Sequence, residues 1–411
     1  MSELHIGRMY WPTTVADVRR YAPLSGNVKA DVAIVGGGMS GVTCAHELSR
    51  AGMDVVLAER GEIAGESTTA STGLLQFCND IMLTDLSNQI GKHPARMFYK
   101  ACRDAMEQLA AIADSLPYEI GFKRRSSLYY ASSEQDLPKL KEEFDALSAC
   151  GLDVAYWTGD DVAKQFPFRK PGAILTGGDA EVNPFRFVHA IAESAFEQGL
   201  RIYEGTDITS RETLQGGSHR LHASSGHHID AEHVVYAVGY EPESLRGRLI
   251  KPSFGRTFVI VTDKQRDLSR WHDRCLLWET ARPYLYLRTT DDGRIIAGGL
   301  DEAVREPLLG GQSRQSHNEK LLSRVQALFP DLPLTADFAW NATFGESQDN
   351  LPFIGEDPDW PNVYYSLGYG GNGTVYSMLA ATLIGQLIDG TADRNPIKDI
   401  VSLSRATLKE R

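Results

Sequence analysis

Three glycines near the N-terminus and one acid after them have the residue types and spacing of a phosphate-binding turn with a sugar-binding partner. Gly36, Gly38 and Gly41 follow an apolar run, and Glu59 comes 18 residues after Gly41. The first glycine allows a tight turn, the second lets backbone approach a pyrophosphate, and the third lets a helix pack closely on a sheet. A carboxylate at the later position can accept hydrogen bonds from ribose hydroxyls. The pattern predicts an adenine dinucleotide site.

The elements that must position these residues can be read from the same stretch. An apolar strand precedes Gly36, a helix begins near Met39, and a second strand ends at Glu59. The N-terminus of the helix, with Met39 and Ser40, then directs the positive end of its dipole at the phosphates. Because strand, turn, helix, second strand and acid occur in order, we interpret the stretch as a complete nucleotide-binding unit and not as a chance glycine-rich turn.

The stretch after the acid shows no regular hydrophobic period and is rich in small and hydroxyl-bearing residues. Such a stretch can lay N–H groups and hydroxyls along an extended cofactor, whereas a flexible linker would have no specific partners. We expect cofactor contacts here from Arg60, Ser67, Thr68, Thr69, Ser71, Thr72, Gly73 and Leu74.

Composition and charge narrow the class of protein. With 411 residues and 42% hydrophobic content, the chain can bury two cores. Its formal charge of −12 disfavours nucleic acid and anionic membranes as partners. No apolar run approaches the roughly 18 residues that a membrane span needs, and the N-terminus lacks the pattern of a signal peptide. We therefore expect a cytoplasmic location.

The cysteines and histidines do not predict a metal centre. Five cysteines are present, an odd number, and none forms a CxxC pair. The 11 histidines are scattered, and His227 and His228 lie in a Gly/Ser-rich segment typical of a solvated hairpin tip. We expect neither structural disulfides nor a metal site.

Four further segments, in this order, resemble the family of FAD-dependent amine and D-amino acid oxidoreductases that includes glycine oxidase, sarcosine oxidase and gamma-glutamylputrescine oxidase. They are residues 231–239, 293–299, 340–355 and 365–374. The last two are most similar to the gamma-glutamylputrescine oxidase branch. With the N-terminal unit, the resemblance covers nearly the whole chain, and it implies that the dinucleotide is FAD.

The resemblance also implies the fold class and the organisation of the chain. The fold expected is α/β, a Rossmann-like FAD-binding domain interleaved with an antiparallel-sheet (α+β) substrate domain, of the glutathione reductase/D-amino acid oxidase type. Segments 28–91, 160–243 and 338–400 would form the FAD domain, and segments 92–159 and 244–337 the substrate domain. Further FAD contacts are implied for Ile208, Ala237, Gly239, Gly368, Gly371, Asn372, Gly373 and Thr374.

Hydrophobic periodicity indicates several elements outside the N-terminal unit. Helices are expected at 94–116, 134–150 and 184–199, a short strand at 200–203, a hairpin within 206–238, and an antiparallel sheet within 254–300.

Two positions depart from patterns within the family. Sarcosine oxidase-like members anchor the flavin through a cysteine where this chain has Ala342, and other members use a histidine in a loop that corresponds to residues 61–76, which contain none. FAD is therefore expected to bind without a covalent link. Glycine oxidase-like members clamp the substrate carboxylate with an arginine where this chain has Phe344, and an aromatic ring cannot replace a bidentate clamp. This favours an amine or N-substituted substrate, unless another arginine has taken over.

The candidate substrate contacts each have two interpretations. Glu279 and Arg282 could bind opposite ends of a zwitterion, with Arg282 replacing the clamp, or could pair with each other at a sheet edge. Tyr284 and Tyr286 lie on the same face of a strand, so both wall the pocket or both belong to the core. Trp340 either packs or lines the pocket.

The implied chemistry is the oxidation of an amine or amino acid by transfer of a hydride equivalent to the flavin, with O2 or another electron acceptor completing the cycle. Backbone N–H groups of the glycine-rich turn at 370–374 would stabilise the negative charge on the reduced flavin. A general base is not required. Two alternatives stay open, a flavoenzyme of the same fold that oxidises a 2-hydroxy acid, and a non-catalytic flavoprotein subunit. Substrate identity and oligomeric state cannot be read from the sequence.

Overall fold

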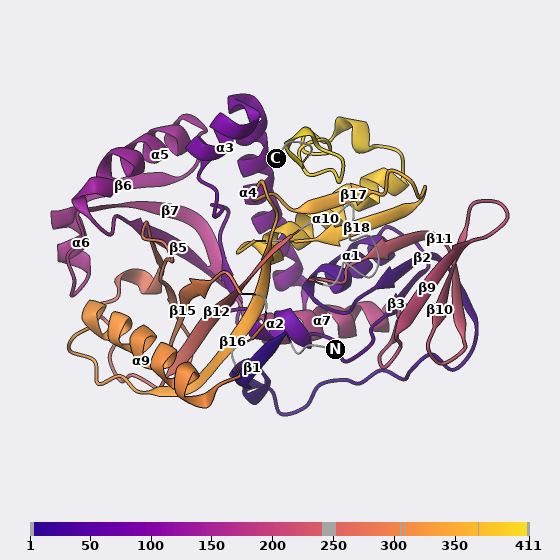
Figure 1. Cartoon of the computed structure of the whole chain (residues 1–411), viewed down its shortest axis with the longest axis horizontal. Coiled ribbons are helices and arrows are strands. Elements are labelled where there is room, and N and C mark those ends of the chain that lie inside the picture. The colour runs from indigo at the N-terminus through magenta and orange to yellow at the C-terminus, as the bar shows by residue number, and fades with distance from the viewer. Residues whose placement is uncertain (1–3, 241–251, 305, 308, 369, 409–411) are drawn as a thin grey trace.

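Two β-sheets, each with its own helices, make up the molecule (Figure 1). The computed structural model describes residues 4–240, 252–304, 306–307, 309–368 and 370–408. Within these residues one sheet has eight strands and the other has ten. The chain crosses repeatedly between the sheets, as the predicted interleaved α/β fold class requires, and that prediction is confirmed.

The eight-stranded sheet has a parallel centre of apolar strands. Its order is β17-β18-β11-β2-β3-β8, and a hairpin of β9 and β10 extends β11. Strands β8, β3, β2, β11 and β18 run parallel, while β17 pairs antiparallel with β18 and β10 pairs antiparallel with β11. The strands are β2 (Val28–Val35), β3 (Val55–Ala58), β8 (Arg201–Tyr203), β9 (Ile208–Thr213), β10 (His219–Ala223), β11 (His228–Tyr236), β17 (Phe353–Glu356) and β18 (Val363–Leu367).

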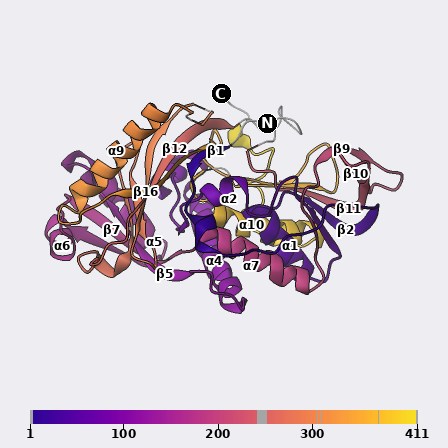
Figure 2. The same cartoon turned by 90° about the horizontal axis from the view of Figure 1, so that it is seen from below.

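Helices pack beside this sheet. Helix α1 (Met39–Arg50) packs against α7 (Pro184–Glu197) and α10 (Gly373–Ile388), and α10 packs against α4 (Lys92–Ser115). These elements lie together in both views of the molecule (Figures 1 and 2). The predicted helices at 94–116 and 184–199 correspond to α4 and α7. Helix α7 begins where expected because Pro184 occupies its first turn and Asn183 accepts a hydrogen bond from the Arg186 N–H.

The ten-stranded sheet is mostly antiparallel and carries the order β1-β16-β12-β15-β14-β13-β5-β7-β4, with β6 paired to β7. Its strands are β1 (His5–Arg8), β4 (Leu74–Leu75), β5 (Lys123–Tyr130), β6 (Val154–Thr158), β7 (Gly172–Glu181), β12 (Ser253–Thr262), β13 (Leu276–Glu279), β14 (Tyr286–Thr289), β15 (Ile295–Glu302) and β16 (Ala336–Glu346). The antiparallel pairing expected within 254–300 holds for β12 with β15 and for β14 with β13 and β15.

The remaining helices lie around the ten-stranded sheet and the loop that follows β3. They are α2 (Glu66–Ala70), α3 (Leu83–Ile90), α5 (Leu137–Ala149), α6 (Gly159–Gln165) and α9 (Gly311–Leu328). Helix α5 corresponds to the helix expected at 134–150. Helix α9, which packs on β12 and β15, was not predicted. Its buried positions are only Leu321, Val325 and Leu328, so its apolar stripe is short.

The sheets divide the chain differently from the predicted domain boundaries. Strand β7 lies within 160–243, which was assigned to the FAD domain, yet it pairs with β5 in the ten-stranded sheet. Strand β16, most of which lies within 338–400, pairs with β12 in that same sheet. An apolar strand does not reveal its partner, so the sequence could not place these two. The predicted boundary at 243/244 falls outside the described residues. Within those residues, no helix is both long and apolar enough to cross a membrane.

Candidate active site

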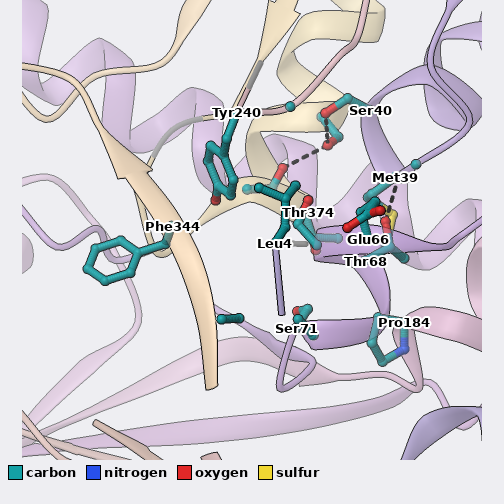
Figure 3. Close-up of a pocket in the computed structure, with 18 of the residues that line it drawn as sticks. Leu4, Met39, Ser40, Glu66, Thr68, Ser71, Pro184, Tyr240, Phe344 and Thr374 are labelled. Atoms are coloured by element: carbon teal, nitrogen blue, oxygen red, sulfur yellow. Dashed lines mark hydrogen bonds between the residues drawn. The ribbon is translucent and has the colours of Figure 1, made fainter. Parts of the chain in front are cut away.

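A cavity of about 460 Å³ runs between the two sheets. One end is lined by the turn after β2, and the other by side chains from the ten-stranded sheet. Figure 3 shows Met39 and Thr68 on one side of this space, with Tyr240 and Phe344 across from them. The volume lies in the range of cofactor and ligand sites in proteins.

The turn between β2 and α1 forms a close-packed cradle. Gly36 has φ +111°, and a Cβ added at Gly41 would lie 1.9 Å from the Gly36 carbonyl oxygen. Helix α1 therefore approaches the sheet as closely as the glycine pattern predicts. The Met39 N–H donates to the Thr68 hydroxyl at 3.1 Å, which ties the helix start to the loop after Glu59. Gly36, Gly38, Met39 and Ser40 all line the cavity.

Glu59 also lines the cavity, and its carboxylate is already oriented by backbone. It accepts the N–H of Gly37 at 2.6 Å and of Gly61 at 2.7 Å. Burial raises the pKa of Glu59, while these two hydrogen bonds oppose the rise. A carboxylate oxygen has further lone pairs, so Glu59 can still accept ribose hydroxyls.

The loop after Glu59 contributes most of its predicted contacts, but not all. Arg60, Ser67, Thr68, Ser71, Thr72 and Leu74 line the cavity, as do Ile208, Ala237 and Gly239 from the other strand ends. Thr69 and Gly73 do not. The Thr69 hydroxyl donates to the Ala64 carbonyl at 2.6 Å, and Gly73 leaves room for the Val182 carbonyl, which an added Cβ would approach to 2.2 Å. Gly41 does not line the cavity either, and it instead allows α1 to pack closely on the backbone at Gly36.

The glycine-rich turn before α10 closes the middle of the cavity. Gly368, Gly371, Asn372, Gly373 and Thr374 line it, while Tyr369 lies outside the described residues.

Asn79, from the loop after β4, holds this turn in place. Its side-chain oxygen accepts from the Asn372 amide at 3.0 Å and from the Tyr376 hydroxyl at 2.8 Å. Ser377 donates to the Gly373 carbonyl at 2.7 Å and lies 2.9 Å from the Ser40 hydroxyl, which joins the starts of α10 and α1. The N-termini of two helices thus meet at one cavity.

The far end of the cavity has an aromatic wall. Tyr240, Tyr284, Tyr286 and Phe344 line it. The Tyr284 and Tyr286 rings have centroids 5.6 Å apart. A Cβ added at Gly298 would lie 2.2 Å from the Tyr286 ring, and one added at Gly255 would lie 2.8 Å from the Phe344 ring. Each ring therefore lies over a glycine on the neighbouring strand.

Three carboxylates share this end with the aromatic rings, namely Asp80, Asp301 and Glu346. Asp80 accepts from the Tyr284 hydroxyl at 3.1 Å and from the Gly371 N–H at 2.6 Å. Burial raises the pKa of Asp301 to about 6, and the nearby Asp80 charge adds to the rise. Burial also raises the pKa of Glu346, with Asp80 and Asp301 contributing. The pKa shifts show that these acids lie close enough to repel each other.

A β-bulge directs Asp301 into the cavity. Strands β12 and β15 pair in register at Phe258 with Gly299 and at Arg256 with Glu302, so Leu300 and Asp301 together oppose the single residue Thr257. Bulges re-aim side chains in this way near functional sites. Sequence alternation alone would not have predicted this direction.

Glu279 does not face the cavity, so its predicted contact with substrate is wrong. It is buried and pairs with Arg324 of α9, and it also accepts from the Ser132 hydroxyl at 3.1 Å and the Leu285 N–H at 3.0 Å. The predicted alternative, a pair with Arg282, is wrong as well. Arg282 is exposed and donates to the carbonyls of Glu279, Thr280 and Ala281 at 3.1–3.4 Å.

Arg282 and Trp340 lie outside the inner cavity. Arg282 lines an outer cavity that shares Tyr284, Phe344 and the three carboxylates with the inner one. Trp340 is 2% exposed and donates from its ring N–H to the Ala70 carbonyl at 3.0 Å. Of its two interpretations, packing is the one that this geometry favours.

Comparisons with known proteins agree with the geometry. The family model described as "FAD dependent oxidoreductase" matches residues 31–387. Gamma-glutamylputrescine oxidoreductase of Escherichia coli is 26% identical over 92% of this chain and 89% of its own length. A Bacillus subtilis protein whose name describes a Rieske 2Fe-2S iron-sulfur protein is 23% identical over 96% of this chain and 75% of its own. The crystal structure of glycine oxidase from Geobacillus kaustophilus superposes with a TM-score of 0.78 at 21% identity, covering 92% of this chain and 99% of that one.

Proposed function

We propose, because this chain belongs to the FAD-dependent oxidoreductase family, that it oxidises the C–N bond of an amine or amino acid to an imine. The observation that carries the proposal is the single cavity that joins a dinucleotide cradle to a chamber of tyrosine rings and carboxylates. Such a chamber suits a basic nitrogen compound, since aromatic faces and carboxylates both attract cations. The E. coli relative and the superposed crystal structure are both named for enzymes that act on nitrogen compounds.

The cradle residues fit FAD. The backbone around Gly36 and Gly38 would hold the pyrophosphate at the start of α1, Glu59 would bind a ribose, and the turn at 371–374 would lie at the isoalloxazine. When bound, FAD supplies an acceptor for two electrons and a hydrogen, transferred as hydride. The N–H groups at the start of α10 would then stabilise the negative charge that reduction adds.

The chamber residues would select the reactive form of the substrate. The carbon next to nitrogen gives up its hydrogen with the bonding electron pair only when the nitrogen lone pair is free to form the C=N bond. A reacting nitrogen that lies against Phe344 and away from the carboxylates would be desolvated there, and desolvation favours the neutral amine over the ammonium. The resulting iminium loses its N–H proton to water, and water then hydrolyses the imine to a carbonyl compound and an amine or ammonia.

Anaerobic titration of the bound flavin tests the proposal. The purified holoenzyme is mixed with primary amines, N-methyl amino acids, D-amino acids and 2-hydroxy acids, and bleaching near 450 nm is followed. Bleaching by at least one nitrogen compound is expected. Bleaching by hydroxy acids alone would assign the chain to the hydroxy acid oxidation that was the first alternative. Inertness toward every compound, with a stable protein partner in pull-downs, would support the non-catalytic subunit.

The same preparation of reduced enzyme can identify the electron acceptor. After anaerobic reduction, the enzyme is mixed either with O2 or with a dye acceptor, and the two reoxidation rates are compared. Fast reaction with O2 would define an oxidase, and fast reaction with the dye alone would define a dehydrogenase.

A further inference from the structure

The three carboxylates of the chamber differ in how the protein compensates their charge. Asp80 accepts two hydrogen bonds, from the Tyr284 hydroxyl and the Gly371 N–H. In Asp301 the oxygen Oδ1 is buried and accepts no hydrogen bond from the described residues. The Glu346 carboxylate has no hydrogen bond or ion pair within the same part of the chain. Both half-buried acids therefore face the cavity with little compensation from the described residues, since Glu346 has no partner there and Asp301 has only the Thr257 hydroxyl.

Leaving such charges unpaired costs stability, because burial removes water that would otherwise solvate them. Both acids belong to strands of the ten-stranded sheet, and Asp301 is aimed inward by a bulge. A fold that maintains this arrangement gains most if a ligand supplies the missing positive charge. The polar groups thus point to a cationic ligand.

The basic residues that the structure describes supply that charge only in part. Along the inner cavity Arg60 lies at the ribose end, next to Glu59. Arg282 stands at the rim and lowers the pKa values of Asp301 and Glu346, but it is exposed and bound to backbone carbonyls. One rim arginine cannot neutralise three carboxylates that are themselves partly buried.

An organic cation fits the chamber better than a metal ion. Among the described residues, no group of three or more His, Cys, Asp or Glu side chains is close enough to hold a metal. The rings of Tyr284 and Tyr286 lie beside the acids, and the Arg282 guanidinium lies 4.9 Å from the Tyr284 ring centroid. Aromatic faces also attract ammonium groups within about 6 Å of the ring centroid, which the Tyr286 ring could do. Acid and ring together recognise an alkylammonium.

We propose that the substrate is an amine with a second, cationic nitrogen, as in a diamine, and that Asp301 and Glu346 bind this remote ammonium while the first nitrogen reacts. The inference rests on the proposed function, since it names the substrate class of the same site. Phe344 is consistent with it, because an aromatic ring stands where a carboxylate clamp was expected. The outer cavity of about 720 Å³ shares these acids, so an incoming cation meets them at the entrance.

A matched series of compounds tests the substrate class. Anaerobic flavin reduction is measured with 1,4-diaminobutane and 1,5-diaminopentane, with butylamine and pentylamine, and with 4-aminobutanoate. The diamines should half-saturate reduction at concentrations at least tenfold below those of monoamines of the same length, and 4-aminobutanoate should be the poorest. A preference for 4-aminobutanoate or for α-amino acids would overturn the inference and make Arg282 the anchor.

Variants test the residues. Asp301→Asn and Glu346→Gln should each raise the half-saturating concentration of the diamine about tenfold, and should raise that of the monoamine several-fold less. Asp145→Asn is the control, because it removes one exposed carboxylate on α5 outside both cavities. The FAD content and melting temperature of each variant report whether it folds. Equal losses for diamine and monoamine would overturn the assignment of these acids to the remote ammonium.

A binding measurement separates the inference from the proposed function. Pentyltrimethylammonium has no nitrogen lone pair and cannot be oxidised, so its binding to the holoenzyme by calorimetry reports cation recognition alone. Binding that is lost in Asp301→Asn and kept in Asp145→Asn is expected, and absence of binding would count against the inference. If no nitrogen compound bleaches the flavin, the proposed function fails. If monoamines bleach it as efficiently as diamines, the inference fails alone.

Discussion

The two ends of the cavity are built from different parts of the chain. At the cradle end, close-packed glycines and backbone N–H groups line the space, and Glu59 is held by two backbone donors. At the chamber end, side chains from strands β12, β14, β15 and β16 meet, and the Glu346 carboxylate and one oxygen of Asp301 have no partner among the described residues. The polar groups of the first end are paired with each other, while the second end carries negative charge that Arg282 and the Thr257 hydroxyl offset only in part. A cofactor that does not vary can be bound by backbone groups, whereas selection of one substrate over another requires side chains.

The strongest consequence of a backbone cradle is complete release of the cofactor on unfolding. Position 342, where a cysteine would anchor the flavin, is Ala342, and residues 61–76 contain no histidine. We expect acid or heat precipitation to leave all of the FAD in the supernatant, as judged by its absorbance and fluorescence. Flavin fluorescence that migrates with the denatured chain on a gel would reveal a covalent bond elsewhere.

Crowding the cradle should have the next largest effect. In Gly41→Ala the new Cβ would lie 1.9 Å from the Gly36 carbonyl oxygen, so helix α1 must move away from the sheet. We expect destabilisation of about 3 kcal/mol, typical of overpacking, together with loss of bound FAD. The measurements are the ratio of flavin to protein absorbance and the melting temperature. Gly26→Ala, at a site with no neighbour within 4 Å, is the control and should behave as the native protein.

Removing the acid of the cradle should weaken the cofactor without unfolding the chain. Glu59→Ala deletes the carboxylate that would accept the ribose hydroxyls, and a charge-assisted hydrogen bond contributes about 1.5–3 kcal/mol. The dissociation constant for FAD, measured by quenching of flavin fluorescence on addition to apoprotein, should rise at least tenfold. Glu232→Ala, an exposed acid on the same sheet, should leave it unchanged. An unaltered constant in Glu59→Ala would mean that the ribose is bound elsewhere.

Removing a carboxylate from the chamber should stabilise the fold, whereas the substitutions in the cradle should weaken the fold or the binding of FAD. Burial raises the pKa of Asp301 to about 6 from an ordinary 3.8, so folding becomes less favourable as pH rises from about 4 to 6, where only the unfolded state ionises. Asp301→Asn avoids this cost. Its melting temperature in the absence of substrate should exceed that of the native protein by a margin that grows toward pH 6 and stays level above it. Melts at pH 4.5, 6 and 8 check this, and a margin independent of pH would rule out the titration of Asp301 as the cause.

The smallest effect is expected at the rim. Arg282 is exposed and donates to backbone carbonyls, so Arg282→Lys should change the half-saturating concentration of a diamine by no more than about twofold, with FAD content unaltered. A large rise would instead show that the guanidinium binds a substrate carboxylate, which lysine cannot replace as a bidentate donor.

The cradle could be predicted from sequence because its parts are consecutive. Gly36, Gly38 and Glu59 lie within one strand–helix–strand unit, so their spacing already contains their geometry. Tyr284 and Tyr286 both line the cavity, but the prediction that they share one strand face holds only for Tyr286, because β14 begins at Tyr286 and Tyr284 precedes it. The positions of the cradle residues depend mainly on their own strand–helix–strand unit, which the local sequence pattern already indicates.

The carboxylates of the chamber could not be predicted in the same way. Asp80 and Glu346 are more than 260 residues apart in the chain, and Asp301 faces inward only because of a bulge that alternation does not reveal. The prediction for Glu279 was wrong for a related reason, because its partner Arg324 lies on α9, a helix that the periodicity did not indicate. A pocket assembled across strands needs the strand order, which single-sequence patterns do not contain.

The glycines behind the aromatic wall offer a way to resize the chamber from outside. Gly298 lines neither cavity and Gly255 lines only the outer one, yet the rings of Tyr286 and Phe344 lie against them. A methyl group at Gly298 would push the Tyr286 ring forward and shorten the space available to a substrate chain, without altering a single polar group. Substitution of Gly298 would therefore change the length of the space that a substrate can occupy from behind the Tyr286 ring, and not through the acids proposed to bind the substrate.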